Sequence, residues 1–200
     1  MFSSQIRNAL QADPYVSPYF AGVFPCDRLQ QLDIRTTPFA LVANTDPSYR
    51  NGEHWVAFHV DDKGRSEYFD SYGFPPLQEE FQDFALRTLQ DVNKDSGEKV
   101  TFNNVQLQAI DSDVCGQYCI AYLAKRARGT SMPSIIKTYS GLRPGAKDKS
   151  MAEAVNRQYG IEKLQLSVGA GAGVGTVVEQ CCCCANSSHN YISCVHACQY

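Results

Sequence analysis

A predicted β-hairpin constrains the fold of this chain more than any other feature of its sequence. Trp55–Val60 and residues 67–71 carry aromatic and β-branched side chains, and the polar turn between them contains Gly64. This pattern predicts two antiparallel strands joined by a short turn. Because a lone hairpin is only marginally stable, further strands are needed, and Phe39–Asn44 and residues 100–107 are the candidates.

Helices are expected on the faces of that sheet. In residues 77–92, apolar side chains recur at helical spacing, which predicts an amphipathic helix. Three more helices are predicted over residues 4–12, 115–128 and 150–159. Because strands and helices interleave without a regular βαβ rhythm, we expect an α+β fold with a largely antiparallel central sheet flanked by helices.

The length of the chain fits one domain followed by a tail. Two hundred residues can bury a core of their own. We assign residues 1–165 to this domain and residues 166–200 to a Gly/Ala- and Cys-rich low-complexity tail, which holds six of the nine cysteines. Adjacent thiols such as Cys181 to Cys184 cannot all point at one zinc ion from a regular backbone. We therefore predict no metal site.

The chain is mildly acidic overall but basic in one segment. A net charge of −3 argues against a surface built as a whole to bind nucleic acid. The segment from Lys125 to Lys149 holds seven basic residues and one acid. It fits either a solvated helix end and loop or a local nucleic-acid surface. We predict no membrane span, and Arg7 lies where a signal peptide would be apolar, so an intracellular protein is expected.

The hairpin brings a histidine and an aspartate together. If it is centred near Asp62, His54 and Asp70 are directly opposed, with Cβ atoms about 5 Å apart. A carboxylate at this distance can fix the tautomer of an imidazole and stabilise the imidazolium. A slip of one residue would put them on opposite faces. His59 lies on the other face, without a carboxylate at matched spacing, so His54 is the predicted base.

Cys115 is the candidate nucleophile. It lies where a loop enters the predicted helix over residues 115–128, and the N–H groups and dipole of a helix N-terminus favour a thiolate. The next residue, Gly116, is predicted to leave room for a substrate carbonyl near the backbone amides. Cys119, one turn later in an apolar setting, fits an inert buried cysteine, which is also the alternative for Cys115.

Taken in order, these residues resemble the adenovirus-type (adenain-like) cysteine endopeptidases, a group related to the proteases that act on ubiquitin-like modifiers. The resemblance runs from Tyr19 to Lys125, about half of the chain. Its main elements are His54-Trp55, Phe69-Asp70, and the pattern Gln-x6-Cys-Gly-x-x-Cys formed by Gln108, Cys115, Gly116 and Cys119. The stretch from Tyr19 to Phe24 and the Tyr72-Gly73-Phe74 that follows the acid also resemble the viral branch of this group.

The resemblance implies a role for each of these residues. The implied catalytic set is His54, Asp70, Gln108 and Cys115. Gln108 would stabilise the oxyanion of the tetrahedral intermediate together with the backbone N–H of Cys115. Trp55 would narrow the cleft and so favour Gly-rich sequences before the scissile bond. From the residues alone, a polar strand end for Gln108 and core packing for Trp55 stay open.

The expected function is that of a cysteine endopeptidase that cleaves Gly-containing sites in protein precursors. Its setting would be that of a virus-like or transposon-encoded maturation protease, a monomer in the host nucleus or the virion. The alternatives are a deconjugase of ubiquitin-like modifiers and a non-catalytic protease-like binding module.

Family resemblance also implies activation by DNA or by a capsid-derived peptide, although the chemistry itself needs no cofactor. A disulfide-linked peptide lacks an attachment point between Cys26 and Cys115, because no cysteine lies there. Only the segment from Lys125 to Lys149 supports a contact with DNA.

Overall fold

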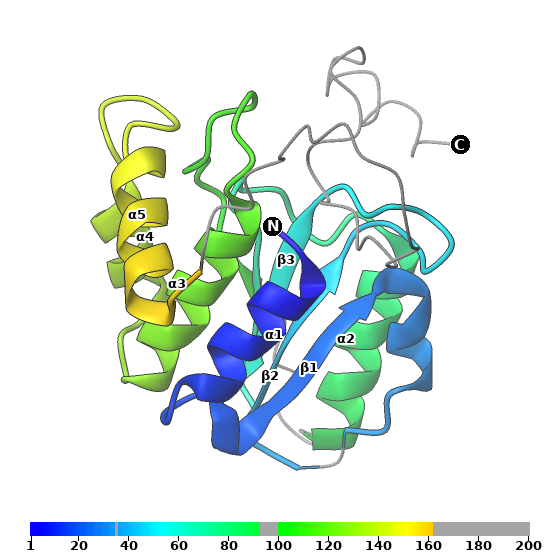
Figure 1. The fold of residues 1–200 in the computed structure, drawn as a ribbon. Helices are drawn as coiled ribbons and strands as arrows, with labels where there is room; N and C mark the ends of the chain where they lie inside the picture. The colour runs from blue at the N-terminus through cyan, green and yellow to red at the C-terminus, as the bar shows by residue number, and fades with distance from the viewer. Residues whose placement is uncertain (35, 93–99, 162–200) are drawn as a thin grey trace, which may run out of the picture.

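The computed structural model describes residues 1–34, 36–92 and 100–161 (Figure 1). The predicted tail, residues 166–200, and its boundary at residue 165 lie outside the described residues. The helices and strands, in chain order, are α1 (Ser3–Ala12), β1 (Phe20–Pro25), β2 (Phe39–Asn44), β3 (Trp55–Val60), β4 (Ser66–Phe69), α2 (Glu79–Val92), β5 (Thr101–Phe102), α3 (Cys115–Ala127), α4 (Met132–Tyr139) and α5 (Asp148–Tyr159), with 3-10 helices at Ser17–Tyr19 and Cys26–Gln31.

The five strands form one sheet in the order β1-β2-β3-β4-β5. Its centre is antiparallel as predicted, because β3 pairs with β2 on one side and with β4 on the other. At the edges, however, β1 runs parallel to β2 and β5 runs parallel to β4. The sheet is therefore mixed. Both parallel pairs follow connections long enough to carry the chain back in the same direction, and one of these contains α2.

The last strand is much shorter than the predicted strand over residues 100–107. Pairing ends after Thr101–Phe102 because the side chain of Asn103 takes the place of a backbone partner. Its Oδ1 accepts from the backbone N–H of Asp70 at 2.9 Å, and its Nδ2 donates to the carbonyl of Asp70 at 2.6 Å. This buried amide thereby holds the backbone of Asp70 directly beyond the end of β4.

Helices cover both faces of the sheet (Figure 1). One core lies between the sheet and the helices α1, α3 and α5, and the ring of Tyr122 on α3 stacks on Phe69 at 4.3 Å. The other core lies under α2, where Phe81 and Phe84 pack edge-on against Phe58. In the described parts of the chain, no helix has the length and apolar character needed to cross a bilayer.

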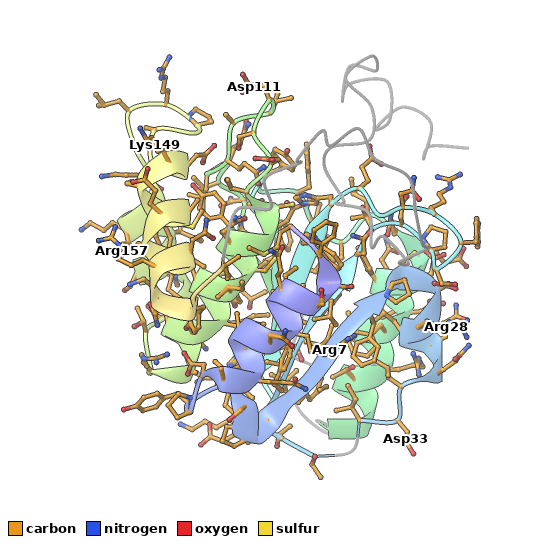
Figure 2. All side chains as sticks on the ribbon, viewed as in Figure 1. Arg7, Arg28, Asp33, Asp111, Lys149 and Arg157 are labelled. Atoms are coloured by element: carbon orange, nitrogen blue, oxygen red, sulfur yellow. The ribbon has the colours of Figure 1, made fainter. Side chains whose placement is uncertain are left out.

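The basic segment from Lys125 to Lys149 contains more helix than its sequence suggested. It contains α4, a helix that the sequence did not predict, which begins with Pro133 in its first turn and buries Met132 and Ile135. Other parts of the segment are exposed, as Figure 2 shows for Lys149 near the start of α5.

Candidate active site

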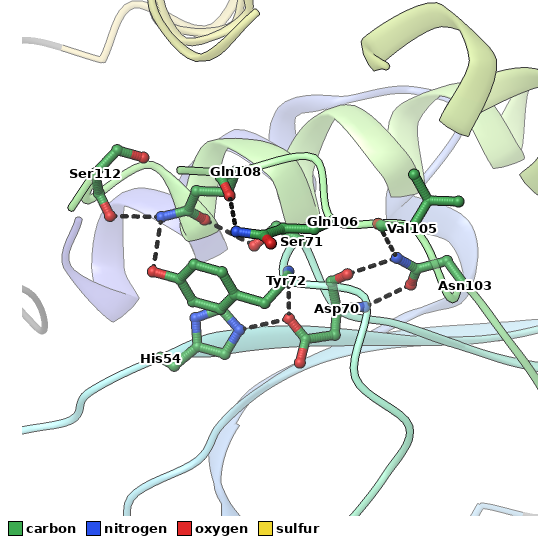
Figure 3. A network of polar contacts seen from close by, with 9 residues as sticks. All are labelled: His54, Asp70, Ser71, Tyr72, Asn103, Val105, Gln106, Gln108 and Ser112. Carbon is green, nitrogen blue, oxygen red and sulfur yellow. Dashed lines mark hydrogen bonds and ion pairs between the residues drawn. The ribbon is translucent and has the colours of Figure 1, made fainter. Parts of the chain in front are cut away.

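His54 and Asp70 form a buried pair (Figure 3). His54 Nε2 lies 2.8 Å from Asp70 Oδ1, and each residue is only 4% exposed. The register differs from the predicted one: Phe58 faces Tyr68, so the hairpin is centred at Lys63 and Asp70 lies diagonally from His54. Because this shift moves the pairing by two positions, it leaves both side chains on the same face. The predicted pair therefore forms across a diagonal.

Tyr72, for which no role was predicted from the sequence, contacts both members of this pair. Its backbone N–H donates to Asp70 Oδ1 at 2.8 Å, and its ring lies against the ring of His54 with centroids 4.7 Å apart. If the observed register is continued beyond the end of β4, Tyr72 comes opposite His54, so a hairpin centred at Lys63 would have suggested this neighbour. Since a carboxylate only accepts hydrogen bonds, His54 donates through Nε2 and keeps Nδ1 as the basic nitrogen.

Gln108 is fully buried and its amide is oriented by its neighbours (Figure 3). Its Nε2 donates to the carbonyl of Ser112 at 2.6 Å, and its Oε1 accepts from the hydroxyl of Ser71 at 2.7 Å. Because a backbone carbonyl can only accept, Ser112 fixes which end of the amide carries the N–H groups. The second N–H makes only a long contact of 3.3 Å to the hydroxyl of Tyr72. This N–H is therefore the one that can turn to another acceptor.

Cys115 is the first residue of α3, as predicted, and is 1% exposed. It lies three positions after Ser112, whose carbonyl accepts a hydrogen bond from the side chain of Gln108. Burial raises the pKa of Cys119 well above its ordinary value, and its electrostatic interactions with Cys115 and Asp70 raise it further. Cys119 thus has the properties of the inert buried thiol expected from the sequence.

Trp55 and Gly116 are packed against the start of the chain. The indole N–H of Trp55 donates to the carbonyl of Met1 at 3.2 Å, and Trp55 is buried in the core that contains Cys115. A Cβ atom on Gly116 would lie 2.8 Å from Met1 Sδ and 3.2 Å from Ile6 Cδ1. The glycine therefore permits close packing of α1 on α3. These contacts match the core-packing alternative for Trp55 and give no support to substrate binding by Gly116.

The expectation that His59 lacks a carboxylate partner is wrong. In the observed register, Glu67 lies directly opposite it, with His59 Nδ1 3.6 Å from Glu67 Oε2. The same oxygen accepts from the Tyr122 hydroxyl and from Arg126 Nε, both at 2.6 Å. Burial alone would raise the pKa of Glu67, but these contacts hold it below the ordinary value. The cluster ties α3 to β4.

Two arginines of the basic segment form ion pairs within the protein. Arg126 binds Glu67 at 2.6 Å, and Arg128 binds the buried carboxylate of Asp13 at 3.0 Å. The side chain of Arg126 is only 12% exposed, whereas that of Arg128 is 36% exposed beside Asp13. Of these two cations, only Arg126 is therefore withdrawn from a surface that could contact a nucleic acid. Among the residues that the structure describes, no three His, Cys, Asp or Glu side chains form a candidate metal site.

Comparisons with known proteins bear on the fold. No protein-family model and no curated protein sequence matches the chain. Two structures of the ASFV pS273R protease are similar. One has 21% identity and a TM-score of 0.54 over 78% of this chain and 68% of that protein. The other, a Se-Met form, has 23% identity and a TM-score of 0.58 over 80% and 66%.

A weaker match is the central domain of the uncharacterized Lpg1148 protein from Legionella pneumophila, with 16% identity and a TM-score of 0.46 over 80% of this chain and 95% of that one. The chain spans about two thirds of the length of the ASFV protease. The likeness shows a shared fold: the α+β fold of this chain, built on a mixed five-stranded sheet, resembles that of the ASFV protease.

Proposed function

We propose that this chain is a cysteine endopeptidase with Cys115 as its nucleophile. The observation that carries the proposal is the buried 2.8 Å pair of His54 and Asp70, linked through Tyr72 and Gln108 to the loop that enters α3 at Cys115. An imidazole held through Nε2 by a carboxylate keeps Nδ1 ready to exchange a proton with a thiol. The cysteine-protease fold supports the same reading.

The reaction would follow the order of covalent catalysis. The thiolate of Cys115 attacks the scissile carbonyl carbon, and the oxyanion accepts hydrogen bonds from the second N–H of Gln108 and from the backbone N–H of Cys115. The C–N bond then breaks as the imidazolium of His54 gives its proton to the leaving amine. Water, deprotonated by His54, attacks the thioester and breaks the C–S bond. Asp70 stabilises the imidazolium at each stage.

The burial of the thiol bears on the substrate. Because Cys115 is 1% exposed, the residues next to the scissile bond must be slender to reach it, which favours glycine. We therefore propose Gly-containing sites in protein chains as the substrate class. The order of His54, Asp70, Gln108 and Cys115 along the chain also resembles proteases that process precursors.

The test compares the wild type with two cysteine variants on a library of Gly-containing peptides. Cys115→Ala should abolish cleavage, whereas Cys119→Ala should retain it, because both changes remove a thiol from α3 but only one removes the nucleophile. Equal cleavage by the wild type and Cys115→Ala would reject the proposal. Cleavage of folded ubiquitin-like fusions but of no peptide would favour a deconjugase.

Alkylation gives a second measurement that needs no substrate. Iodoacetamide should modify Cys115 rapidly near neutral pH, and His54→Ala should slow that reaction because the thiolate loses its imidazolium partner. Slow modification of Cys115 in the wild type, unchanged by His54→Ala, would favour a binding module.

A further inference from the structure

A buried carboxylate outside the predicted site holds the loop that carries Gln108. We propose that Asp148 is a positioning residue for Gln108 and hence for the oxyanion site. This inference rests on the proposed peptidase function and deepens it. Asp148 is 8% exposed and is the first residue of α5, distant in sequence from the other site residues.

Both oxygens of Asp148 are used in hydrogen bonds. Oδ2 accepts from the backbone N–H of Ala109 at 3.1 Å and from the hydroxyl of Ser112 at 2.6 Å. Oδ1 accepts from the hydroxyl of Tyr118 on α3 at 2.8 Å. One carboxylate thus joins α5 to both ends of the turn that follows Gln108 and to the helix that begins at Cys115.

The loop before α5 also contacts the chain on the other side of Gln108, at Leu107. The backbone N–H of Gly145 donates to the carbonyl of Leu107 at 2.7 Å. Gly145 has a φ of +80°, and a Cβ there would lie 2.5 Å from Ala109 Cβ. Its lack of a side chain therefore permits the close approach. Figure 2 shows the two loops near each other, with Asp111 labelled on one and Lys149 just beyond the other.

These contacts reach the oxyanion donor through Ser112. The hydroxyl of Ser112 is held by Asp148, and its carbonyl accepts from Gln108 Nε2 at 2.6 Å. The carbonyl of Ser112 decides where the second N–H of Gln108 points. A carboxylate can accept from all three donors at once, whereas an asparagine amide has one accepting oxygen and a donating nitrogen. Asp148→Asn would therefore disturb the turn and misdirect Gln108.

The experiment separates positioning from mere stability. Asp148→Asn should lower kcat about 10- to 100-fold with KM unchanged, because the oxyanion contact forms only in the transition state. The rate at which iodoacetamide modifies Cys115 should stay at the wild-type value, since alkylation of a thiolate forms no oxyanion. In the Gln108→Ala background, Asp148→Asn should change kcat less than about twofold, because both changes remove the same interaction.

Asp13→Asn is the matched control. Asp13 is also a buried carboxylate, 1% exposed, and it accepts from a backbone N–H at Tyr15 and from the hydroxyl of Tyr159. This control should destabilise the protein and leave kcat unchanged. If Asp148→Asn fails to fold, Ser112→Ala replaces it, because it removes one donor and keeps the bonds of Asp148 to Ala109 and Tyr118.

Three results would overturn the inference. Wild-type kcat in both Asp148→Asn and Ser112→Ala would show that the turn needs no carboxylate. Multiplicative losses in the double variant with Gln108→Ala would show that Asp148 acts elsewhere. Equal cleavage by the wild type and Cys115→Ala would overturn this inference together with the peptidase itself, so the two failures are told apart by the Cys115 variant.

Discussion

A single oxygen of Asp70 serves two donors, and this makes Asp70→Asn an informative substitution. Oδ1 accepts from His54 Nε2 and from the backbone N–H of Tyr72, each at 2.8 Å. In the asparagine variant, the N–H of Tyr72 would hold the amide oxygen at that position and keep the amide nitrogen away from His54. The tautomer of the imidazole should therefore survive, and only the negative charge should be lost.

The expected loss follows from the difference between a charged and a neutral hydrogen bond. A hydrogen bond to a charged group contributes about 1.5–3 kcal/mol and a neutral one about 0.5–1.5 kcal/mol. The difference of about 1–1.5 kcal/mol corresponds to roughly a tenfold lower kcat/KM. Asp70→Ala removes the acceptor of both donors and frees the imidazole to rotate, so its loss should approach the full contribution of a general base, about 10³-fold.

The assay measures kcat/KM for both variants on a peptide that the wild type cleaves, with thermal denaturation as the check that each variant is folded. The prediction is a graded series from wild type through Asp70→Asn to Asp70→Ala. If the asparagine variant were as impaired as the alanine variant, the claim that Tyr72 holds the amide in place would be refuted. Full activity of the asparagine variant would refute a role for the charge.

Three further predictions concern the surroundings. Gln108→Ala should lower kcat about 10²- to 10³-fold while the iodoacetamide rate of Cys115 stays unchanged; a slower alkylation would argue against a purely oxyanion role. Glu67→Gln leaves the partly buried Arg126 without its carboxylate and should lower the free energy of unfolding, measured in urea at pH 7, by about 3 kcal/mol. The pKa of Glu67 is lowered in the folded protein from its ordinary value of 4.5. The stability that its carboxylate contributes is therefore fully present above about pH 4.5 and is lost as the pH falls through the lowered pKa. A stability difference between wild type and Glu67→Gln that persists below that pKa would contradict this role of the carboxylate. Gly116→Ala should reduce the free energy of unfolding by about 1–2 kcal/mol, because its Cβ would lie 2.8 Å from Met1 Sδ; thermal stability equal to wild type would show that Met1 yields freely.

Much of the framework could be predicted from local patterns. The hairpin, the helix that begins at Cys115 and the α+β class all depend on residues close together in the chain. The His54–Asp70 pair could be predicted for a related reason: a register error of two positions preserves the face of a strand. The same error concealed Glu67 opposite His59 and the contact of Tyr72 with His54, because the identity of neighbouring residues on two strands depends on the register itself.

The edges of the fold could not be predicted in this way. β1 and β5 are edge strands whose direction depends on the path of long connections. The helix α4 lies within a basic segment that was expected to be a loop. The end of β5 is decided by Asn103, which bonds to a residue 33 positions earlier. No local pattern encodes such a contact.

By itself, the sequence determined which residues could do chemistry and which face or helix end each would occupy, because side-chain alternation and helix starts are properties of short segments. Only the tertiary structure decided which groups support them. Two such contacts join residues far apart in the chain: Asp148 with Ser112, 36 positions apart, and Met1 with Trp55, 54 positions apart. They form because helices pack together on one face of the sheet, and this packing depends on all the side chains of the core.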